Sequence, residues 1–251
     1  MNIRHTIKLA IMRWSSMRHR NHKSKILFYH DICQGEGYRS LDSGDLMATD
    51  IELFKEHIAV IREEGYKIVP HIKNPEGEVA IMLDDGFRGI WENRQFFYDN
   101  KIFPTVFLPV EYIGQVDKGI LSKEEILELQ AHGFTFESHG WTHDELTRKT
   151  DDELRLELGE SKDLLSRMLG TRVTALCLPL GLFTDHLLDE IKQYDYREVY
   201  SCVPGNYEEP APGGMRRRNL CQFASPEEVR LILRGGNEML KTRYQKMHHK
   251  G

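Results

Sequence analysis

The sequence predicts an α/β protein built as a distorted (β/α) barrel of about seven strands. Apolar runs that suit strands alternate with helical patterns about six or seven times along the chain, which is typical of a parallel sheet covered by helices. The chain of 251 residues has the length of one barrel domain. A doubly wound open sheet is the alternative, but no Gly-rich dinucleotide fingerprint follows any expected strand.

The expected elements follow one another along the chain. Strands are predicted at residues 26–29, 66–69, 79–83, 104–108, 134–137 and 173–178 and near residue 199. Helices are predicted after the N-cap Asp50, over 91–100, after the capping boxes that open at Ser122 and Thr150, over 185–193 and after Ser225. Polar residues stand just after strands, at His30, Asp84, Asp85, His139 and Gly181. In a barrel such strand ends gather on one face, where active sites are built.

The composition narrows the class of protein. A net charge of −5 argues against general nucleic-acid binding, which requires a strongly basic domain. The four cysteines, Cys33, Cys177, Cys202 and Cys221, are widely spaced and indicate separate thiols. Neither a membrane-spanning run nor the pattern of a secretory signal is present, so a cytoplasmic protein is expected.

The two ends of the chain differ from its centre. We expect a basic amphipathic extension over residues 1–24, a catalytic domain over 25–235 and a basic tail over 236–251. One apolar stripe recurs at helical spacing in the extension, formed by Ile3, Ile7, Ala10, Ile11, Trp14 and Met17. Such a helix either lies on an anionic membrane surface or packs its apolar face onto the fold.

The central strand leads directly into two adjacent carboxylates. The apolar run 79–83 reads as a buried strand, and Asp84, Asp85 and Gly86 follow it. Neighbouring side chains on a strand point in different directions, so one carboxylate can bind a cation while the other serves as a base. The alternative interpretation is a strand that ends in an ordinary Asp-Asp-Gly turn.

A second motif places two histidines close together. His139 and His143 are four positions apart and share one face if the segment is helical. Together with one aspartate after the central strand they would form a three-ligand site with an open position, the arrangement of catalytic zinc. Surface histidines without a role are the alternative interpretation.

These motifs, in this order, resemble those of the polysaccharide deacetylases of the NodB-homology type, carbohydrate esterase family 4. The resemblance covers residues 25–222. Residues 83–86 resemble the first motif of the family, 138–143 resemble its His-x-x-x-His motif, and 179–181 resemble the end of its third motif. Residues 27–31 resemble the opening strand of the subgroup that deacetylates poly-N-acetylglucosamine. The resemblance implies a NodB-type barrel.

The resemblance also implies a role for each matched position. A divalent metal, with zinc expected, would be held by Asp85, His139 and His143. Asp84 would be the general base, and the backbone N–H of Leu180 would stabilise the oxyanion. We expect substrate contacts from His30, Trp141, Pro179 and Arg217. Arg217 belongs to a run of three arginines, which is either a strand that supports the site or a solvated basic patch.

Two departures from the family pattern concern catalysis. Cys177 stands where many members carry the arginine that orients the catalytic aspartate. The Leu-x-x-His motif that usually supplies the general acid is missing, since no histidine lies between His186 and the terminal His248 and His249. The leaving amine would then be protonated by Asp84, by His30 or by no efficient group.

The resemblance therefore predicts a metal-dependent hydrolase that removes an N-acetyl group from an amino-sugar glycan. The alternatives are a deacylase or deformylase of a lipid-linked sugar and a degenerate member that only binds carbohydrate. The expected partner is an N-acetylated carbohydrate and not nucleic acid. The basic extension adds an expected peripheral contact with anionic membrane, at the inner membrane surface.

Overall fold

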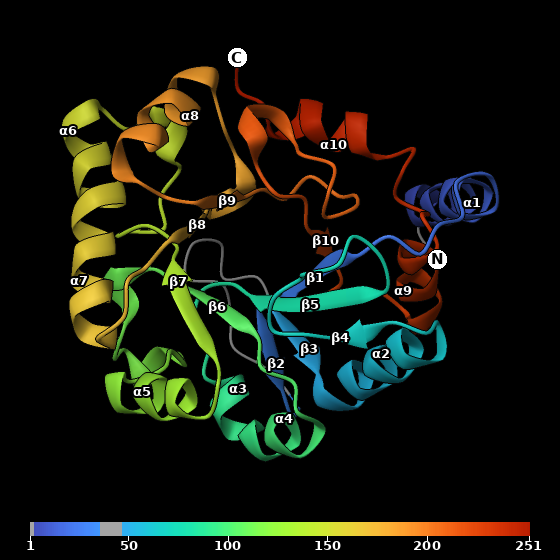
Figure 1. The fold of residues 1–251 in the computed structure, drawn as a ribbon, viewed down its shortest axis with the longest axis horizontal. Helices are drawn as coiled ribbons and strands as arrows, with labels where there is room; N and C mark the ends of the chain where they lie inside the picture. The colour runs from blue at the N-terminus through green and yellow to red at the C-terminus, as the bar shows by residue number, and fades with distance from the viewer. Residues whose placement is uncertain (1–2, 36–46) are drawn as a thin grey trace.

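The fold is a curled, all-parallel sheet surrounded by helices (Figure 1). The structure is a computed structural model that describes residues 3–35 and 47–251, with side chains from His5 onward. Seven strands follow one another in the order β10-β1-β5-β6-β7-β8-β9, and β4 pairs with the start of β5. The strands are β1 (Lys25–Tyr29), β4 (Lys67–Ile68), β5 (Glu78–Leu83), β6 (Thr105–Leu108), β7 (Thr135–Ser138), β8 (Ala175–Cys177), β9 (Glu198–Tyr200) and β10 (Asn219–Leu220). The predicted distorted barrel of about seven strands is confirmed.

One late segment brings the two ends of this sheet together. Arg216 forms a parallel bridge with Tyr200, and the Ser201 N–H donates to the carbonyl of Arg216 at 3.0 Å. At the other end of the segment, the Cys221 N–H donates to the carbonyl of Phe28 at 3.0 Å. Residues 216–221 therefore connect β9 with β1, and side chains from this segment can enter the barrel.

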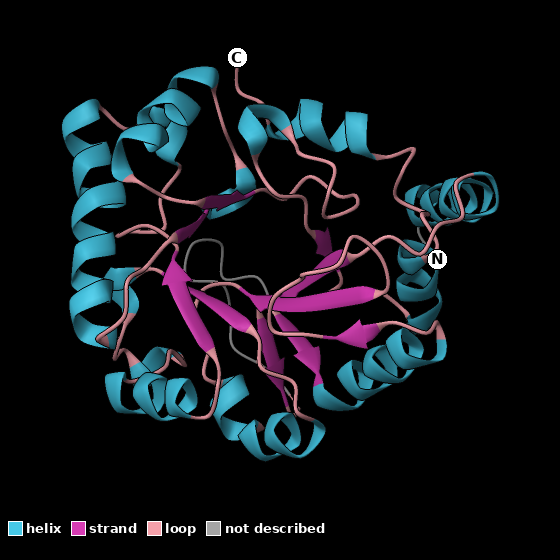
Figure 2. Cartoon of the chain, in the orientation of Figure 1, coloured by secondary structure: helices cyan, strands magenta, loops and turns pink. Residues whose placement is uncertain are grey.

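Helices cover the outside of the sheet (Figure 2). They are α2 (Ile51–Glu63), α3 (Gly89–Glu92), α4 (Arg94–Asn100), α5 (Lys123–Ala131), α6 (Asp151–Leu154), α7 (Ser161–Leu169), α8 (Asp185–Ile191) and α9 (Pro226–Leu233). The predicted caps are confirmed, because Asp50 accepts from the Glu52 N–H and both capping boxes form. The helix expected after Thr150 is not one regular α-helix, since a π-helical segment (Arg155–Glu160) separates α6 from α7. A short parallel pair, β2 (Asp31–Cys33) and β3 (Ala48–Asp50), was not predicted.

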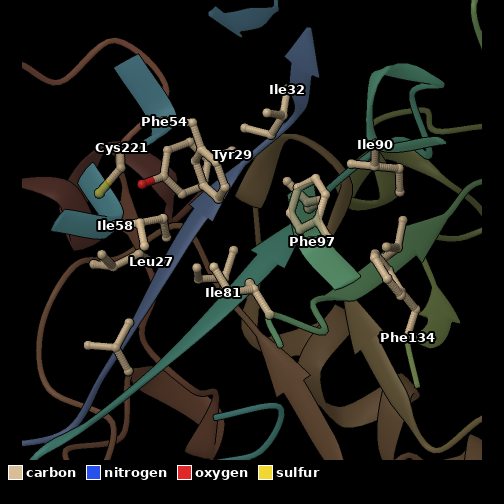
Figure 3. Packing of buried hydrophobic residues seen from close by; sticks show 14 of the residues in the cluster. Leu27, Tyr29, Ile32, Phe54, Ile58, Ile81, Ile90, Phe97, Phe134 and Cys221 are labelled. Atoms are coloured by element: carbon tan, nitrogen blue, oxygen red, sulfur yellow. The ribbon is translucent and has the colours of Figure 1, made fainter. Parts of the chain in front are cut away.

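The main core lies between the sheet and the helices. Every residue of β1 and β5 is buried, as expected for central strands of a parallel sheet. In Figure 3 the rings of Tyr29, Phe54 and Phe97 lie together between the strands and their helices. The Tyr29 ring meets Phe54 edge-on at 5.1 Å, and its hydroxyl hydrogen-bonds His57 Nδ1 at 3.1 Å. Each such side chain contributes about 1.5–3 kcal/mol by burial, so this packing fixes the strand ends that carry the site.

The N-terminal helix α1 (Ile3–Arg18) packs on α9 with a face other than the predicted apolar stripe. Met12, Ser15 and Ser16 are buried, and the Ser15 hydroxyl donates to the carbonyl of Gly235 at 2.9 Å. From the stripe, the side chain of Ile3 lies outside the described residues, Ala10 is exposed and Ile11 is half-buried. The remaining stripe residues are largely exposed, at 55% for Ile7, 49% for Trp14 and 74% for Met17. The expectation that this stripe packs onto the fold is therefore wrong for these three residues. Within the part of the chain that the structure describes, every helix is too short or too polar to span a bilayer.

The C-terminal residues form part of the barrel mouth. Helix α10 (Lys241–His248) is held by ion pairs from Lys241 to Glu209 at 2.5 Å and to Glu238 at 2.6 Å. After the helix, the Phe183 N–H donates to the carbonyl of His248 at 3.0 Å, and the Lys250 N–H donates to the carbonyl of Phe183 at 2.9 Å. The segment expected as a tail thus runs along the loop that follows β8.

Candidate active site

A pocket opens at the carboxyl ends of the strands. Its cavity volume is about 380 Å³. The residues that line it include His30 after β1, Asp84 and Asp85 after β5, and His139 after β7. The remaining lining residues are Phe28, Met47, His143, Leu178, Leu180, Cys202, Leu220, Tyr244 and His248. The polar residues that follow separate strands in the sequence therefore share one cavity, as barrel geometry requires.

Three of these side chains converge on one point. The Nε2 atoms of His139 and His143 lie 3.4 and 3.1 Å from Asp85 Oδ1. The two imidazole ring centres are 4.8 Å apart, and all three residues are buried. This is the set of residues that the resemblance implies as metal ligands.

The chemistry of this cluster fits a divalent cation. Among the described residues, no hydrogen-bond donor satisfies the buried Oδ1 of Asp85. His139 Nδ1 donates to the carbonyl of Cys177 at 2.8 Å, so Nε2 is the ring nitrogen that faces the carboxylate. Burial would raise the pKa of Asp85, but the facing imidazoles of His143 and His139 hold it well below its usual range. Two imidazole nitrogens and one carboxylate are a donor set that zinc accepts.

The histidine loop reaches this geometry without being helical. Residues 139–145 form no helix, which corrects the premise that helical spacing brings the two imidazoles together. Instead, Gly140 and His143 adopt left-handed backbone conformations, with φ values of 80° and 65°. Asp85 does the same, with φ of 70°. Left-handed non-glycine residues are uncommon and concentrate at sites where the surrounding structure enforces them.

The buried carboxylate of Glu157 enforces the shape of the histidine loop. It accepts hydrogen bonds from the backbone N–H groups of Trp141 at 2.7 Å and Thr142 at 3.1 Å, and from the Thr142 hydroxyl at 2.5 Å. A Cβ at Gly140 would come within 2.9 Å of Glu157 Oε2, so only glycine allows this close approach. Glu157 belongs to the π-helical segment, and its role was not predicted from the sequence.

A buried arginine holds the second carboxylate. Arg218 Nη1 and Nη2 donate to Asp84 Oδ1 and Oδ2 at 2.7 and 2.9 Å, and its side chain is fully buried. The guanidinium lies over the rings of Phe28 at 4.2 Å and Phe107 at 5.5 Å. Burial would raise the pKa of Asp84, but the Arg218 guanidinium holds it below its usual value. Asp84 therefore stays ionised at neutral pH.

Arg218 also contacts the thiol of Cys177. Its Nη2 lies 2.8 Å from Cys177 Sγ, and that sulfur lies 3.8 Å from Asp84 Oδ2. The arginine that is missing from the third motif is thus replaced in space by one from the segment that leads into β10.

The remaining predicted residues divide into two groups. His30 and Leu180 line the pocket, and His30 Nδ1 is hydrogen-bonded to Gln222 Oε1. Leu180 is left-handed, with φ of 58°, and is 48% exposed. Trp141 and Pro179 are not among the pocket-lining residues: Trp141 faces a separate surface hollow beside Leu164, and buried Pro179 packs next to Gly140. The pocket therefore does not bring Trp141 and Pro179 together with the metal-ligand cluster.

Arg217 also lies outside the set of residues that line the pocket. Its guanidinium donates to the backbone carbonyls of Pro204, Glu209 and Pro210, away from the pocket. Adjacent side chains in an extended segment point to opposite sides, so only one of two neighbouring arginines can enter the barrel. Within the predicted run of three arginines, Arg218 is the one that reaches Asp84.

The fold and this site define a class: an α/β barrel whose strand ends carry a paired carboxylate and a two-histidine cluster. The sequence profile of the polysaccharide deacetylases matches residues 71–199. The chain belongs to the polysaccharide deacetylase family. A relative from Bacillus subtilis (strain 168), YxkH, whose name assigns it to the polysaccharide deacetylases, is 26% identical over 182 residues. That match covers 67% of this chain and 63% of YxkH, so the chain spans less than two thirds of that relative.

Solved structures show the same fold at low sequence identity. The polysaccharide deacetylase BC0361 from Bacillus cereus is similar with a TM-score of 0.71 and 22% identity, over 84% of this chain and 69% of that one. The deacetylase PplD from Streptococcus pyogenes, solved with acetate, has a TM-score of 0.71 and 18% identity, over 84% and 98%. IcaB from Ammonifex degensii has a TM-score of 0.70 and 16% identity, over 86% and 98%.

Proposed function

We propose that this protein is a metal-dependent hydrolase that removes an N-acetyl group from an amino sugar. The observation that carries the proposal is the buried cluster of Asp85, His139 and His143 beside the ionised Asp84, at the end of an open pocket. Asp85, His139 and His143 would hold a divalent ion, with zinc expected. When bound, such an ion supplies Lewis acidity that polarises the amide carbonyl and makes water a stronger acid.

The residues of the chain supply the proton transfers. Asp84 accepts a proton from the attacking water, and Arg218 keeps the carboxylate ionised and oriented for this step. Water adds to the amide carbonyl carbon, the C–N bond breaks, and the products are acetate and a free amine. Leu180 lines the same pocket, and its backbone N–H is our candidate donor to the oxyanion.

His30 is our candidate proton donor to the leaving amine. It lines the same pocket, and it lies near enough to Asp84 and Asp85 to lower the pKa of both. Its Nδ1 is engaged with Gln222, which orients the ring and leaves Nε2 for the substrate. This role would compensate for the missing C-terminal histidine motif.

A second candidate function is deacylation or deformylation of a lipid-linked sugar at a membrane surface. The observation that favours it is the exposed apolar stripe of α1, formed by Ile7, Trp14 and Met17. We propose that this face contacts anionic lipid, because a basic helix with exposed apolar residues has the properties of an interfacial helix. A protein that only binds carbohydrate is less consistent with the site, because recognition does not require three convergent metal donors.

The test is the release of acetate from N-acetylated sugars by the metal-loaded protein. Chito-oligosaccharides and methyl N-acetylglucosaminide should yield acetate and a new primary amine in equal amounts. Chelation should stop the reaction, and readdition of zinc should restore it. Acetate release that survives complete removal of the metal would contradict the proposal.

A further inference from the structure

A second cavity lies next to the active-site pocket, between the first and the last helices. It has a cavity volume of about 580 Å³ and is lined from one side by α1 and from the other by α10 and the residue before it. In Figure 1 one end of α10 points toward α1. Tyr244 lines both this cavity and the active-site pocket, so the two are adjacent across a single side chain. We call the second cavity the α1–α10 groove.

The spacing of residues on α10 explains why one helix serves both cavities. Tyr244 and His248 are four positions apart and line the active-site pocket. Arg243 and Met247 are also four positions apart, on the neighbouring face, and line the groove. A ligand that fills both cavities would therefore pass over Tyr244.

The groove combines apolar and basic side chains. Ile7 and Ile11 contribute apolar surface from α1, and Met247 contributes it from α10, where it is 54% exposed. Lys8 lines the groove, but its charge is offset by Glu228 at 3.3 Å. Arg243 has no carboxylate partner among the described residues, and no acidic residue occurs between 239 and 251. The groove therefore complements an anion that carries an apolar chain.

We propose that the α1–α10 groove binds the lipid phosphate of an amphiphilic substrate whose sugar occupies the active-site pocket. This inference rests on the proposed function and specifies its substrate class: an N-acylated sugar joined through a phosphate to an apolar chain. The chain lies along Ile7, Ile11 and Met247, and the phosphate meets Arg243. The sugar extends past Tyr244 toward Asp84 and the metal ligands.

The first arm of the test compares two substrates with the same sugar. These are methyl N-acetylglucosaminide and N-acetylglucosamine 1-(decyl phosphate), both used at concentrations where they are monomeric. We expect kcat/KM for acetate release to be about tenfold or more higher for the decyl phosphate substrate, since it adds a charge-assisted contact and apolar burial. Arg243→Glu and Met247→Asp should each lower that ratio about fivefold or more. Lys123→Glu, an exposed charge reversal on α5, is the matched control and should leave the ratio unchanged. Equal kcat/KM for the two substrates, or a ratio unaffected by Arg243→Glu, would overturn the inference.

The second arm needs no catalysis and separates this inference from the proposed function. Titration calorimetry measures the binding of decyl phosphate, with decanol as the uncharged comparison. Binding of decyl phosphate that Arg243→Glu weakens about tenfold supports the groove even if neither sugar releases acetate, in which case the proposed function alone fails. Binding only to anionic vesicles, and not to monomeric decyl phosphate, would assign the surface to membrane contact and overturn the inference. Arg243 and Met247 are exposed, so thermal unfolding of both variants should match that of the wild type.

Discussion

Arg218 and Asp84 form a two-point ion pair inside the barrel, although 134 positions separate them in the chain. The two nitrogen–oxygen distances are 2.7 and 2.9 Å, and the side chains are 0% and 4% exposed. The pair is possible because the segment that leads into β10 closes the barrel next to β1, which in turn pairs with β5. The family motif places the orienting arginine at the position of Cys177, whereas the fold supplies an arginine from the segment that leads into β10.

We predict that Arg218→Met impairs both stability and catalysis. Loss of the guanidinium leaves a buried carboxylate without a counter-charge, which typically costs about 3–5 kcal/mol of unfolding free energy at neutral pH. Burial then dominates and raises the pKa of Asp84, so the acid limb of the kcat/KM profile should move to higher pH. Denaturant unfolding and pH–rate profiles measure the two effects.

The pH dependence of stability provides the control for this prediction. The wild type has a depressed Asp84 pKa, so the stabilisation by the pair is present at neutral pH and is lost as the pH falls through that pKa. The difference in unfolding free energy between wild type and Arg218→Met should therefore shrink toward acid pH. Arg218→Lys keeps the charge but not the two-point geometry, so its unfolding free energy should lie between those of the wild type and Arg218→Met. If the acid limb of the kcat/KM profile lies at the same pH in Arg218→Met and in the wild type, the role given to Arg218 is contradicted.

The two neighbouring aspartates should respond differently to the same substitution. Asp85→Asn should reduce zinc content, because Asp85 Oδ1 faces both imidazoles. Asp84→Asn should retain zinc and lower turnover about 10²–10⁴-fold, the usual cost of losing a positioned base. Metal analysis of the purified variants and acetate release measure the two properties. Near-normal turnover in Asp84→Asn would refute its role as the base, and stoichiometric zinc in a His139→Ala/His143→Ala double variant would refute the metal site.

The role of His30 as proton donor predicts a dependence on the leaving group. His30→Asn should lower acetate release from an N-acetyl sugar about 10²-fold, because the amine leaves only when protonated. Hydrolysis of 4-nitrophenyl acetate should fall less than about threefold, since its phenolate leaves without a proton. Equal losses on the two substrates would show that His30 acts in binding or in folding instead.

Glu157 should control metal affinity from outside the ligand set. Glu157→Ala removes the acceptor for two backbone N–H groups of the histidine loop, so His143 should lose its fixed position. We expect the zinc dissociation constant to rise about 10–100-fold, with activity recovering at saturating zinc. Glu160→Gln, in the same π-helical segment but 49% exposed and ion-paired with Arg155, is the matched control. A drop in melting temperature without any change in zinc affinity would leave Glu157 a purely structural residue.

The sequence predicted the features that depend on local pattern. The strands, the N-cap Asp50 and the capping boxes at Ser122 and Thr150 follow from periodicity and from hydrogen bonds between near neighbours. The clustering of His30, Asp84 and His139 also followed, because parallel strands end on one face.

The features that could not be predicted from the sequence depend on tertiary pairing. The choice between Arg217 and Arg218 is set by which way one strand residue faces after the barrel closes, and a shift of one position reverses it. The Glu157 carboxylate accepts hydrogen bonds from residues 15 and 16 positions earlier in the chain. It does so from a π-helical turn, which no sequence pattern predicts. The approach of Tyr244 and His248 to the pocket requires the last residues to follow Phe183, which only the folded chain shows.

The exposed stripe of α1 leads to a prediction about membranes. Ile7, Trp14 and Met17 are exposed on a helix that packs on α9 and buries Met12, so the protein presents them to its surroundings without unfolding. Residues 1–25 carry seven Lys and Arg and no acid, and each basic residue near an anionic surface adds about 1 kcal/mol. We expect the protein to co-sediment with anionic vesicles, more weakly at high salt and with uncharged vesicles.

Point variants test this contact more sharply than truncation does. Removal of α1 would uncover the surface of α9 on which it packs and the part of the core that contains Met12, and a loss of folding would then imitate a loss of binding. The combined variant Ile7→Ser, Trp14→Ser, Met17→Ser changes only exposed side chains and should lower the vesicle-bound fraction about tenfold or more, because apolar burial in the interface is lost. Val116→Ser and Leu164→Ser, at exposed apolar positions on other surfaces, form the matched control and should sediment like the wild type. If the triple variant and the control sediment equally, the stripe does not contact lipid, and any attraction to the vesicles comes from charge alone.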